Sequence, residues 1–290
     1  MGCGSWSDKD YINYSASVGR STVTRGGVSF VSGNYAAQDI YKSRNLQPEL
    51  NPFNVVRQCC DTDEHPNTIP VILALDVTGS MGSASVEVAK KLSEVMTKLY
   101  DKVRDVEFMI MGIGDLAYDI APIQVSQFES DIRIAEQLDK VYFEGGGGGN
   151  NYESYTAAWY FGARHTELDC WKRGKKGIII TMGDEPLNPY LPKSPLKAAT
   201  GDTVQSDIET KALYDEVKEK FDVYHLAVND SACSYRWYED EIKSSFGKYL
   251  DDEHLFTVSL DNIATAIINI VSNRNDELTE NINTDTGISW

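Results

Sequence analysis

Residues 71–84 read VILALDVTGSMGSA, a run of five apolar residues that ends in Asp76. A short, uninterrupted apolar run is typical of a strand buried on both faces of a parallel sheet. Two hydroxyl side chains follow at alternate positions, Thr78 and Ser80, with Gly79 between them. Because alternate side chains of an extended segment project to the same side, the carboxylate and both hydroxyls are predicted to point to one place at the end of the strand.

Apolar segments and helical patterns alternate along the chain from residue 68 to residue 273. The segments predicted to be strands are 68–76, 105–115, 121–125, 175–184, 222–228 and 254–259. Between the first two, apolar residues recur with helical spacing at Val88, Leu92, Val95 and Leu99. This alternation predicts an α/β fold with a doubly wound, mostly parallel six-stranded sheet flanked by helices. Ligands of such sheets bind at the carboxyl ends of the strands.

The chain is predicted to have three parts. Residues 1–66 are turn-rich and contain a β-hairpin at 21–32, so we expect an N-terminal extension that wraps over the core. Residues 67–274 form the α/β domain, and residues 275–290 form a polar C-terminal tail.

Composition limits the partners of the chain. The 290 residues carry a net charge of −17, which disfavours nucleic acid and anionic membrane surfaces as partners. No apolar run approaches the length of roughly 18 residues needed to cross a bilayer, and no signal peptide is recognisable. The five cysteines are irregularly spaced, as expected for reduced thiols. We therefore expect a cytoplasmic protein.

Three polar segments are predicted to meet at the carboxyl edge of the sheet. They are the loop after Asp76, the glycine-rich loop GGGGGNN at 145–151, and the strand end at Asp184. Their oxygens suit Mg²⁺ or Mn²⁺, hard ions that prefer oxygen ligands. Because a hydroxyl binds a divalent ion weakly, the glycine-rich loop and the last strand end are expected to supply further oxygens.

The segment DVTGSMG resembles the D-x-S-x-S metal-ion-dependent adhesion site of von Willebrand factor A (vWA) domains, with Thr78 replacing the first serine. The resemblance covers residues 68–273, implies a vWA/Rossmann-like fold, and is greatest to bacterial intracellular members. In that family a threonine of the glycine-rich loop joins the metal, and Asn150 takes its place here. The family's last acid occupies the position of Met182, and Asp184 follows two residues later on the same side of the strand. The metal ligands that the resemblance implies are Asp76, Thr78, Ser80, Asn150 and Asp184.

The function implied by the resemblance is binding, with a carboxylate of a partner protein attaching to the metal. Members of the wider group often work beside AAA+ ATPases of the MoxR type. Four residues are expected beside the ligands or at the partner surface: Gly79, Asp115, Glu153 and Glu185. Asp115 either orients a water near the metal or caps a turn. Glu153 either accepts hydrogen bonds near the metal or places a favourable charge in the first turn of a helix.

The same residues allow a different function, a haloacid-dehalogenase-like phosphohydrolase that depends on Mg²⁺. Asp76 would be the nucleophile, Asp184 in GDEPLN would hold the metal, and Lys175 or Lys176 would steady the phosphate. That chemistry usually needs a general acid two residues after the nucleophile, and Thr78 cannot serve. It would also leave Ser80 and the glycine-rich loop without a role. We therefore expect that the protein is not an enzyme.

Overall fold

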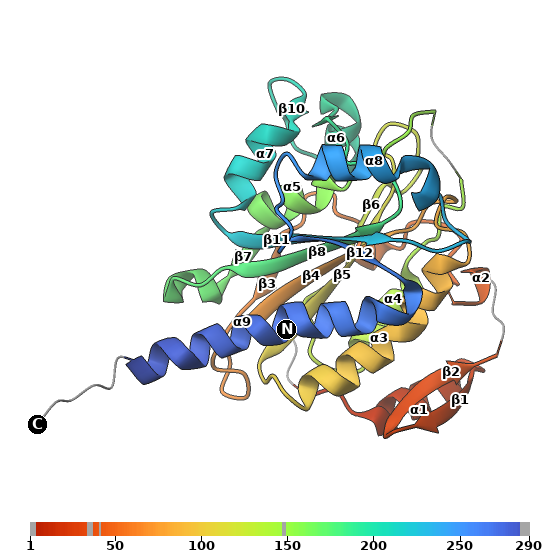
Figure 1. Cartoon of the computed structure of the whole chain (residues 1–290), viewed down its shortest axis with the longest axis vertical. Coiled ribbons are helices and arrows are strands. Elements are labelled where there is room, and N and C mark those ends of the chain that lie inside the picture. The colour runs from red at the N-terminus through yellow and green to blue at the C-terminus, as the bar shows by residue number, and fades with distance from the viewer. Residues whose placement is uncertain (1–3, 34–36, 41, 147–148, 285–290) are drawn as a thin grey trace, which may run out of the picture.

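A six-stranded sheet forms the centre of the molecule (Figure 1). The computed structural model describes residues 4–33, 37–40, 42–146 and 149–284. The strand order across the sheet is β12-β11-β8-β4-β5-β6, and every neighbouring pair is parallel except β5 and β6. The strands are β4 (Ile69–Asp76), β5 (Val106–Ile113), β6 (Ile123–Val125), β8 (Gly177–Gly183), β11 (Phe221–Val228) and β12 (Leu255–Val258). The predicted α/β class and the six-stranded sheet are confirmed.

Helices cover both faces of the sheet (Figure 1). One face is covered by α5 (Thr156–Arg164), α7 (Thr210–Val217) and α8 (Tyr235–Phe246), and the other by α3 (Ala84–Tyr100), α4 (Arg133–Lys140) and α9 (Ile263–Thr284). This double cover explains why β4 is apolar along its length, since only Ile69 of its eight residues is not fully buried. The predicted apolar face of α3 is buried as expected.

Smaller elements complete the α/β region. The segment after β8 contains β9 (Tyr190–Leu191), α6 (Lys193–Thr200) and β10 (Ile208–Glu209), with β9 and β10 paired antiparallel. Beyond α5 lie β7 (Thr166–Leu168) and the 3₁₀ turn η2 (Asp169–Arg173), and η3 (Leu260–Asn262) precedes α9.

The N-terminal extension contains the predicted hairpin, formed by β1 (Ser21–Arg25) and β2 (Val28–Ser32). Gly26 and Gly27 join the strands with φ angles of 58° and 82°, which side chains other than glycine rarely adopt. The Ser93 hydroxyl of α3 donates to the Ser29 carbonyl at 2.8 Å and ties the hairpin to the domain. Before the hairpin lies a helix that the sequence analysis did not predict, α1 (Asp8–Ser17), which begins after the capping side chain of Ser7.

The rest of the extension lies along the β6 edge of the central sheet. It contains α2 (Ala37–Ile40), η1 (Pro48–Leu50) and β3 (Arg57–Cys59), and β3 pairs in parallel with β7. The buried guanidinium of Arg57 donates to the Glu49 carbonyl at 2.7 Å and to the Val125 carbonyl of β6 at 2.9 Å. Arg57 therefore fastens the extension to the β6 edge of the sheet.

The C-terminal helix is longer than the sequence analysis predicted. It was expected to end near residue 272 and to be followed by a loose tail at 275–290, but α9 has 22 residues and runs from Ile263 to Thr284. Residues 285–290 of the predicted tail lie outside the described residues. The helix continues through polar residues past its predicted end, because neither proline nor glycine occurs from residue 263 until residue 287. None of the described helices is both long and apolar enough to pass through a membrane.

Replacing Arg57 tests how much the extension contributes to the fold. Arg57→Ala leaves the buried Val125 carbonyl without its donor, so we expect the free energy of unfolding to fall by about 2 kcal/mol. Urea denaturation measures this change. Arg44→Ala, at an exposed position of the same extension, is expected to change it by less than about 0.5 kcal/mol. Equal effects of the two substitutions would contradict the fastening role of Arg57.

Candidate metal centre

Four of the predicted site residues lie together at the carboxyl ends of β4 and β8. Asp76 is the last residue of β4, and Asp184 directly follows β8, its neighbour in the sheet. The Thr78 hydroxyl donates to Asp76 Oδ1 at 2.6 Å, and its oxygen lies 3.0 Å from Ser80 Oγ. The Ser80 hydroxyl donates in turn to Asp184 Oδ1 at 3.0 Å. A continuous row of oxygens therefore joins the two carboxylates.

The local backbone explains why the Thr78 hydroxyl turns back toward Asp76. Thr78 N–H donates to Asp76 Oδ1 at 2.9 Å, which closes a tight turn of the kind that aspartate side chains favour. The next residue, Gly79, donates its N–H to the Gly146 carbonyl of the glycine-rich loop at 2.7 Å. A Cβ atom on Gly79 would lie only 2.8 Å from that carbonyl oxygen. The glycine thus lets two loops approach closely at the edge of the site.

Both carboxylates are buried without a balancing positive charge. Asp76 is 1% exposed and Asp184 is 0% exposed. Burial raises the pKa of Asp76, and the negative charge of Asp184 raises it further. Burial also raises the pKa of Asp184, although this carboxylate accepts from the Ser234 N–H and from Ser80. The ion pairs among the described residues include neither carboxylate. Such a pair favours binding a proton or a cation.

The oxygen separations fit a small divalent cation. With metal–oxygen distances near 2.1 Å, neighbouring oxygens of an octahedral shell lie about 3.0 Å apart. The three successive pairs along the row are separated by 2.6, 3.0 and 3.0 Å. The described residues hold no group of three or more His, Cys, Asp or Glu side chains arranged for a metal ion. A cation bound here would therefore need the two hydroxyls as well as the two carboxylates.

Tyr155 belongs to the site, and the sequence analysis missed it. Its buried hydroxyl donates to Asp76 Oδ2 at 2.8 Å, so both oxygens of Asp76 accept hydrogen bonds. Burial, followed by the charge of Asp76, raises the pKa of Tyr155 and keeps this hydroxyl a donor. A Cβ atom on Gly183 would lie 1.9 Å from the tyrosine oxygen, so the glycine makes room for it. A glycine next to Asp184 signals such an approach in the sequence without telling which side chain approaches.

Asn150 does not join the other four. Among the described residues its side chain makes no hydrogen bond to Asp76, Thr78, Ser80 or Asp184. The glycine-rich loop instead touches the site through its backbone at Gly146. Residues 147–148 of that loop lie outside the described residues. Asn150 as a metal ligand therefore remains a prediction that the described contacts do not support.

The acidic residues expected around the ligands are largely buried. Asp115 caps a turn by accepting from Ala117 N–H at 2.7 Å, while its Oδ2 has no protein partner among the described residues. Glu153 Oε2 is likewise buried without a partner there, and burial and then the charge of Asp76 raise the pKa of Glu153. Burial and then Asp184 raise the pKa of Glu185 to about 7. In their ionised forms these carboxylates add negative potential around the site, and a bound cation would favour those ionised forms.

Comparison with known proteins gives likeness of fold only. No protein-family model and no curated protein matches the chain. Among solved structures, the pilus adhesin SpaC from Lactobacillus rhamnosus GG has a TM-score of 0.50 and 12% identity, over 77% of this chain and 32% of that chain. The fold is vWA-like.

Two similar structures with lower scores carry that domain name in their descriptions. The vWF domain of the type V pili tip protein Mfa5 from Porphyromonas gingivalis has a TM-score of 0.42 and 11% identity, over 77% of this chain and 98% of that chain. The SpRpn10 VWA domain has a TM-score of 0.41 and 9% identity, over 70% and 94% respectively. The chain spans about a third of the SpaC chain. What these proteins bind is therefore not transferred to the vWA-like protein described here.

The contact between the two loops predicts a loss of stability for one glycine-to-alanine substitution and almost no change for another. Gly79→Ala places a methyl group against the carbonyls of the glycine-rich loop, so we expect the free energy of unfolding to fall by about 1–3 kcal/mol. Gly146→Ala, on the other side of the same contact, meets no atom within 4 Å and is expected to change it by less than about 0.5 kcal/mol. Thermal or urea unfolding distinguishes them, and similar losses for both would contradict the described contact.

Buried carboxylates with raised pKa values predict how stability depends on pH in the absence of divalent cations. Such groups bind protons more tightly in the folded state, so stability falls as pH rises above their ordinary pKa values. For Glu185 this window extends from 4.5 to about 7. Asp76→Asn removes one of these carboxylates, so urea denaturation in chelator should show a smaller loss of stability between pH 5 and 7 for the variant than for wild type, by at least about 1 kcal/mol. If the free energy of unfolding depended on pH equally in variant and wild type, the claim that Asp76 and Asp184 are buried without a balancing positive charge would be contradicted.

Proposed function

We propose that the protein is a metal-dependent protein-binding module. In this proposal Asp76, Thr78, Ser80 and Asp184 hold Mg²⁺ or Mn²⁺, and the bound ion attracts a carboxylate of a partner protein. The observation that carries the proposal is the unbroken row of oxygens between two buried carboxylates that no described cation neutralises.

The charge of the donor set suits an acidic ligand. The bound cation would supply a Lewis-acidic position for the partner's carboxylate. Two of the four donors are neutral hydroxyls, so the first ligands repel an incoming carboxylate less than four carboxylates would. The hydrogen bond from Tyr155 fixes the orientation of Asp76 from below the site. This arrangement supports binding of an anion.

The arrangement gives less support to the phosphohydrolase alternative. Both oxygens of Asp76 accept hydrogen bonds, from Thr78 and from Tyr155, which leaves a poorer nucleophile. Lys176 precedes the first residue of β8 and pairs with Asp222 at 3.6 Å. Asp184 follows the last residue of the same seven-residue strand, about 26 Å away along an extended chain. Neither Lys175 nor Lys176 is therefore positioned to steady a phosphate at the site.

The partner proposal is broader than the metal proposal. The resemblance of DVTGSMG to intracellular vWA domains suggests an AAA+ ATPase of the MoxR type as a partner system and the cytoplasm as the location. The net charge of −17 disfavours nucleic acid, and an acidic partner protein would meet the domain at its metal, where the bound ion offsets the charge of the two carboxylates.

Calorimetric titration with Mg²⁺ and Mn²⁺ tests the metal proposal. We expect one bound ion for wild type and at least about a tenfold weaker affinity for Ser80→Ala. The substitution removes one of the two hydroxyls that join the carboxylates, the one that donates to Asp184. Asp101→Asn, an exposed carboxylate at the far end of α3, is the matched control and should bind as wild type does. Unchanged affinity in Ser80→Ala would contradict the proposed ligand set. The same titration of Asn150→Ala decides whether the Asn150 amide belongs to the ligand set.

A pull-down from cells that express the protein tests the binding function. We expect a partner retained in Mg²⁺, lost in chelator and lost with Ser80→Ala. Incubation with a generic phosphate ester and Mg²⁺ tests the alternative, and turnover that disappears in Asp76→Ala would replace binding with hydrolysis as the function.

A further inference from the structure

The two edges of the central sheet are treated differently by the rest of the chain. At one edge the outer carbonyl of Val125 in β6 is bonded by Arg57, and the N-terminal extension covers the strand. At the other edge β12 pairs with β11 alone, and no described segment pairs with its outer side. Figure 1 shows β12 and α9 on this side of the domain, away from the extension. An uncovered strand edge is a template for pairing with another chain.

The outer edge of β12 offers the backbone groups of Thr257, whereas the outward N–H of Leu255 already donates to the Asp251 carbonyl at 2.9 Å. The His254 carbonyl accepts from His225 N–H at 2.9 Å, and the Val258 carbonyl accepts from Asn229 N–H at 2.8 Å, so residues 254, 256 and 258 direct their backbone groups toward β11. By the alternation of strand hydrogen bonding, Thr257 directs its N–H and C=O outward. The sequence Leu255–Val258 contains no proline, lysine or arginine, the residues that usually protect an exposed edge.

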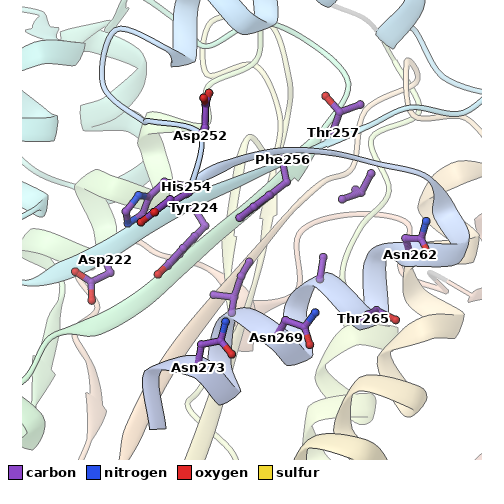
Figure 2. A pocket seen from close by; sticks show the side chains of 14 residues that line it. Asp222, Tyr224, Asp252, His254, Phe256, Thr257, Asn262, Thr265, Asn269 and Asn273 are labelled. Atoms are coloured by element: carbon purple, nitrogen blue, oxygen red, sulfur yellow. The ribbon is translucent and has the colours of Figure 1, made fainter. Parts of the chain in front are cut away.

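A groove lies directly beneath this edge, between the sheet and α9 (Figure 2). Its volume is about 730 Å³, and Tyr224 and Phe256 reach into it from β11 and β12. On α9 it is lined by a row of short polar side chains spaced three or four residues apart, Thr265, Asn269 and Asn273. From residue 262 to residue 273 the helix rises about 16 Å, the length of about five residues of an extended peptide. Amide side chains in such a row can bond to a peptide laid along the helix.

The charge of the groove indicates the chemistry of its ligand. Three acidic residues line it, of which Asp222 pairs with Lys176, while Asp252 and Glu253 are exposed and none of the lining residues is lysine or arginine. Figure 2 shows Asp252 on the loop before β12, with its side chain directed away from α9, and Asp222 near the start of β11. Carboxylates beside aromatic rings favour a basic side chain, which gains ion pairing and contact with the ring faces.

We propose that the β12 edge and the groove beneath it bind an extended, basic segment of a partner protein by strand addition. The segment pairs its backbone with the outward groups of Thr257. Its apolar side chains lie against Phe256, and a lysine or arginine reaches Asp252 and Glu253. This site is separate from the metal centre, which lies at the carboxyl ends of β4 and β8, and it does not depend on the proposed function.

Selection from a phage-displayed library of random 12-residue peptides tests the proposal, with the wild-type protein immobilised in chelator so that the metal centre plays no part. We expect enriched peptides in which lysine or arginine stands among β-branched or aromatic residues. A synthetic copy of one such peptide should bind wild type, and N-methylation of alternate backbone amides in the peptide should weaken binding at least tenfold, because it removes the donors that strand pairing needs.

Variants of the protein separate backbone pairing from charge. Thr257→Pro removes the outward N–H and should weaken the same peptide at least tenfold, whereas Thr257→Val keeps the N–H, loses only the hydroxyl contact with Tyr235, and should stay within threefold. The exposed pair Asp252→Asn/Glu253→Gln should weaken binding at least tenfold without affecting folding. If Thr257→Pro does not fold, the N-methylated peptide and the charge variant still decide the question.

Three results would overturn the proposal. The first is the absence of any enriched peptide, and the second is enrichment of acidic or uncharged peptides that bind the charge variant equally. The third is sedimentation showing that wild type self-associates while Thr257→Pro is monomeric, because the edge would then belong to a second copy of this chain.

Discussion

The structure at the carboxyl edge of the sheet depends on the enforced proximity of two buried carboxylates, Asp76 and Asp184. Two hydroxyls bridge them, and no described cation offsets their charge. Burying two like charges side by side costs free energy, and the attraction of both carboxylates to a bound cation can offset that cost. Several details that are hard to explain otherwise serve this arrangement, including the close loop contact at Gly79 and the space that Gly183 leaves for Tyr155.

The fold separates two surfaces that serve different chemistry. The proposed metal centre lies where neighbouring parallel strands end, and in that proposal its carboxylates attract a cation, which in turn binds an anionic ligand. The groove at β12 lies at the side of the sheet and is acidic without a set of hydroxyl ligands, so it suits a basic segment directly. The described part of the N-terminal extension covers the opposite edge, through Arg57, and none of its strands pairs with β12.

Much of the fold was predictable because burial on both faces makes parallel strands uniformly apolar, as in β4. The positions of Asp76, Thr78 and Ser80 followed from alternation within one short loop. Tyr155 was not predictable, because its contact with Asp76 joins residues 79 positions apart and depends on how α5 packs. Asn150 as a ligand stays a prediction from a motif, because a glycine-rich loop has enough backbone freedom to place that side chain in several ways. The full length of α9 was missed because mostly polar residues follow Val271 in the sequence.

Anomalous diffraction from crystals soaked in Mn²⁺ tests the central claim most directly, because it locates the ion without reference to activity or partner. The account predicts one strong peak within bonding distance of Asp76 and Ser80, with Asp184 beside it. A peak elsewhere, or an unperturbed Ser80–Asp184 hydrogen bond with no ion at saturating Mn²⁺, would contradict it.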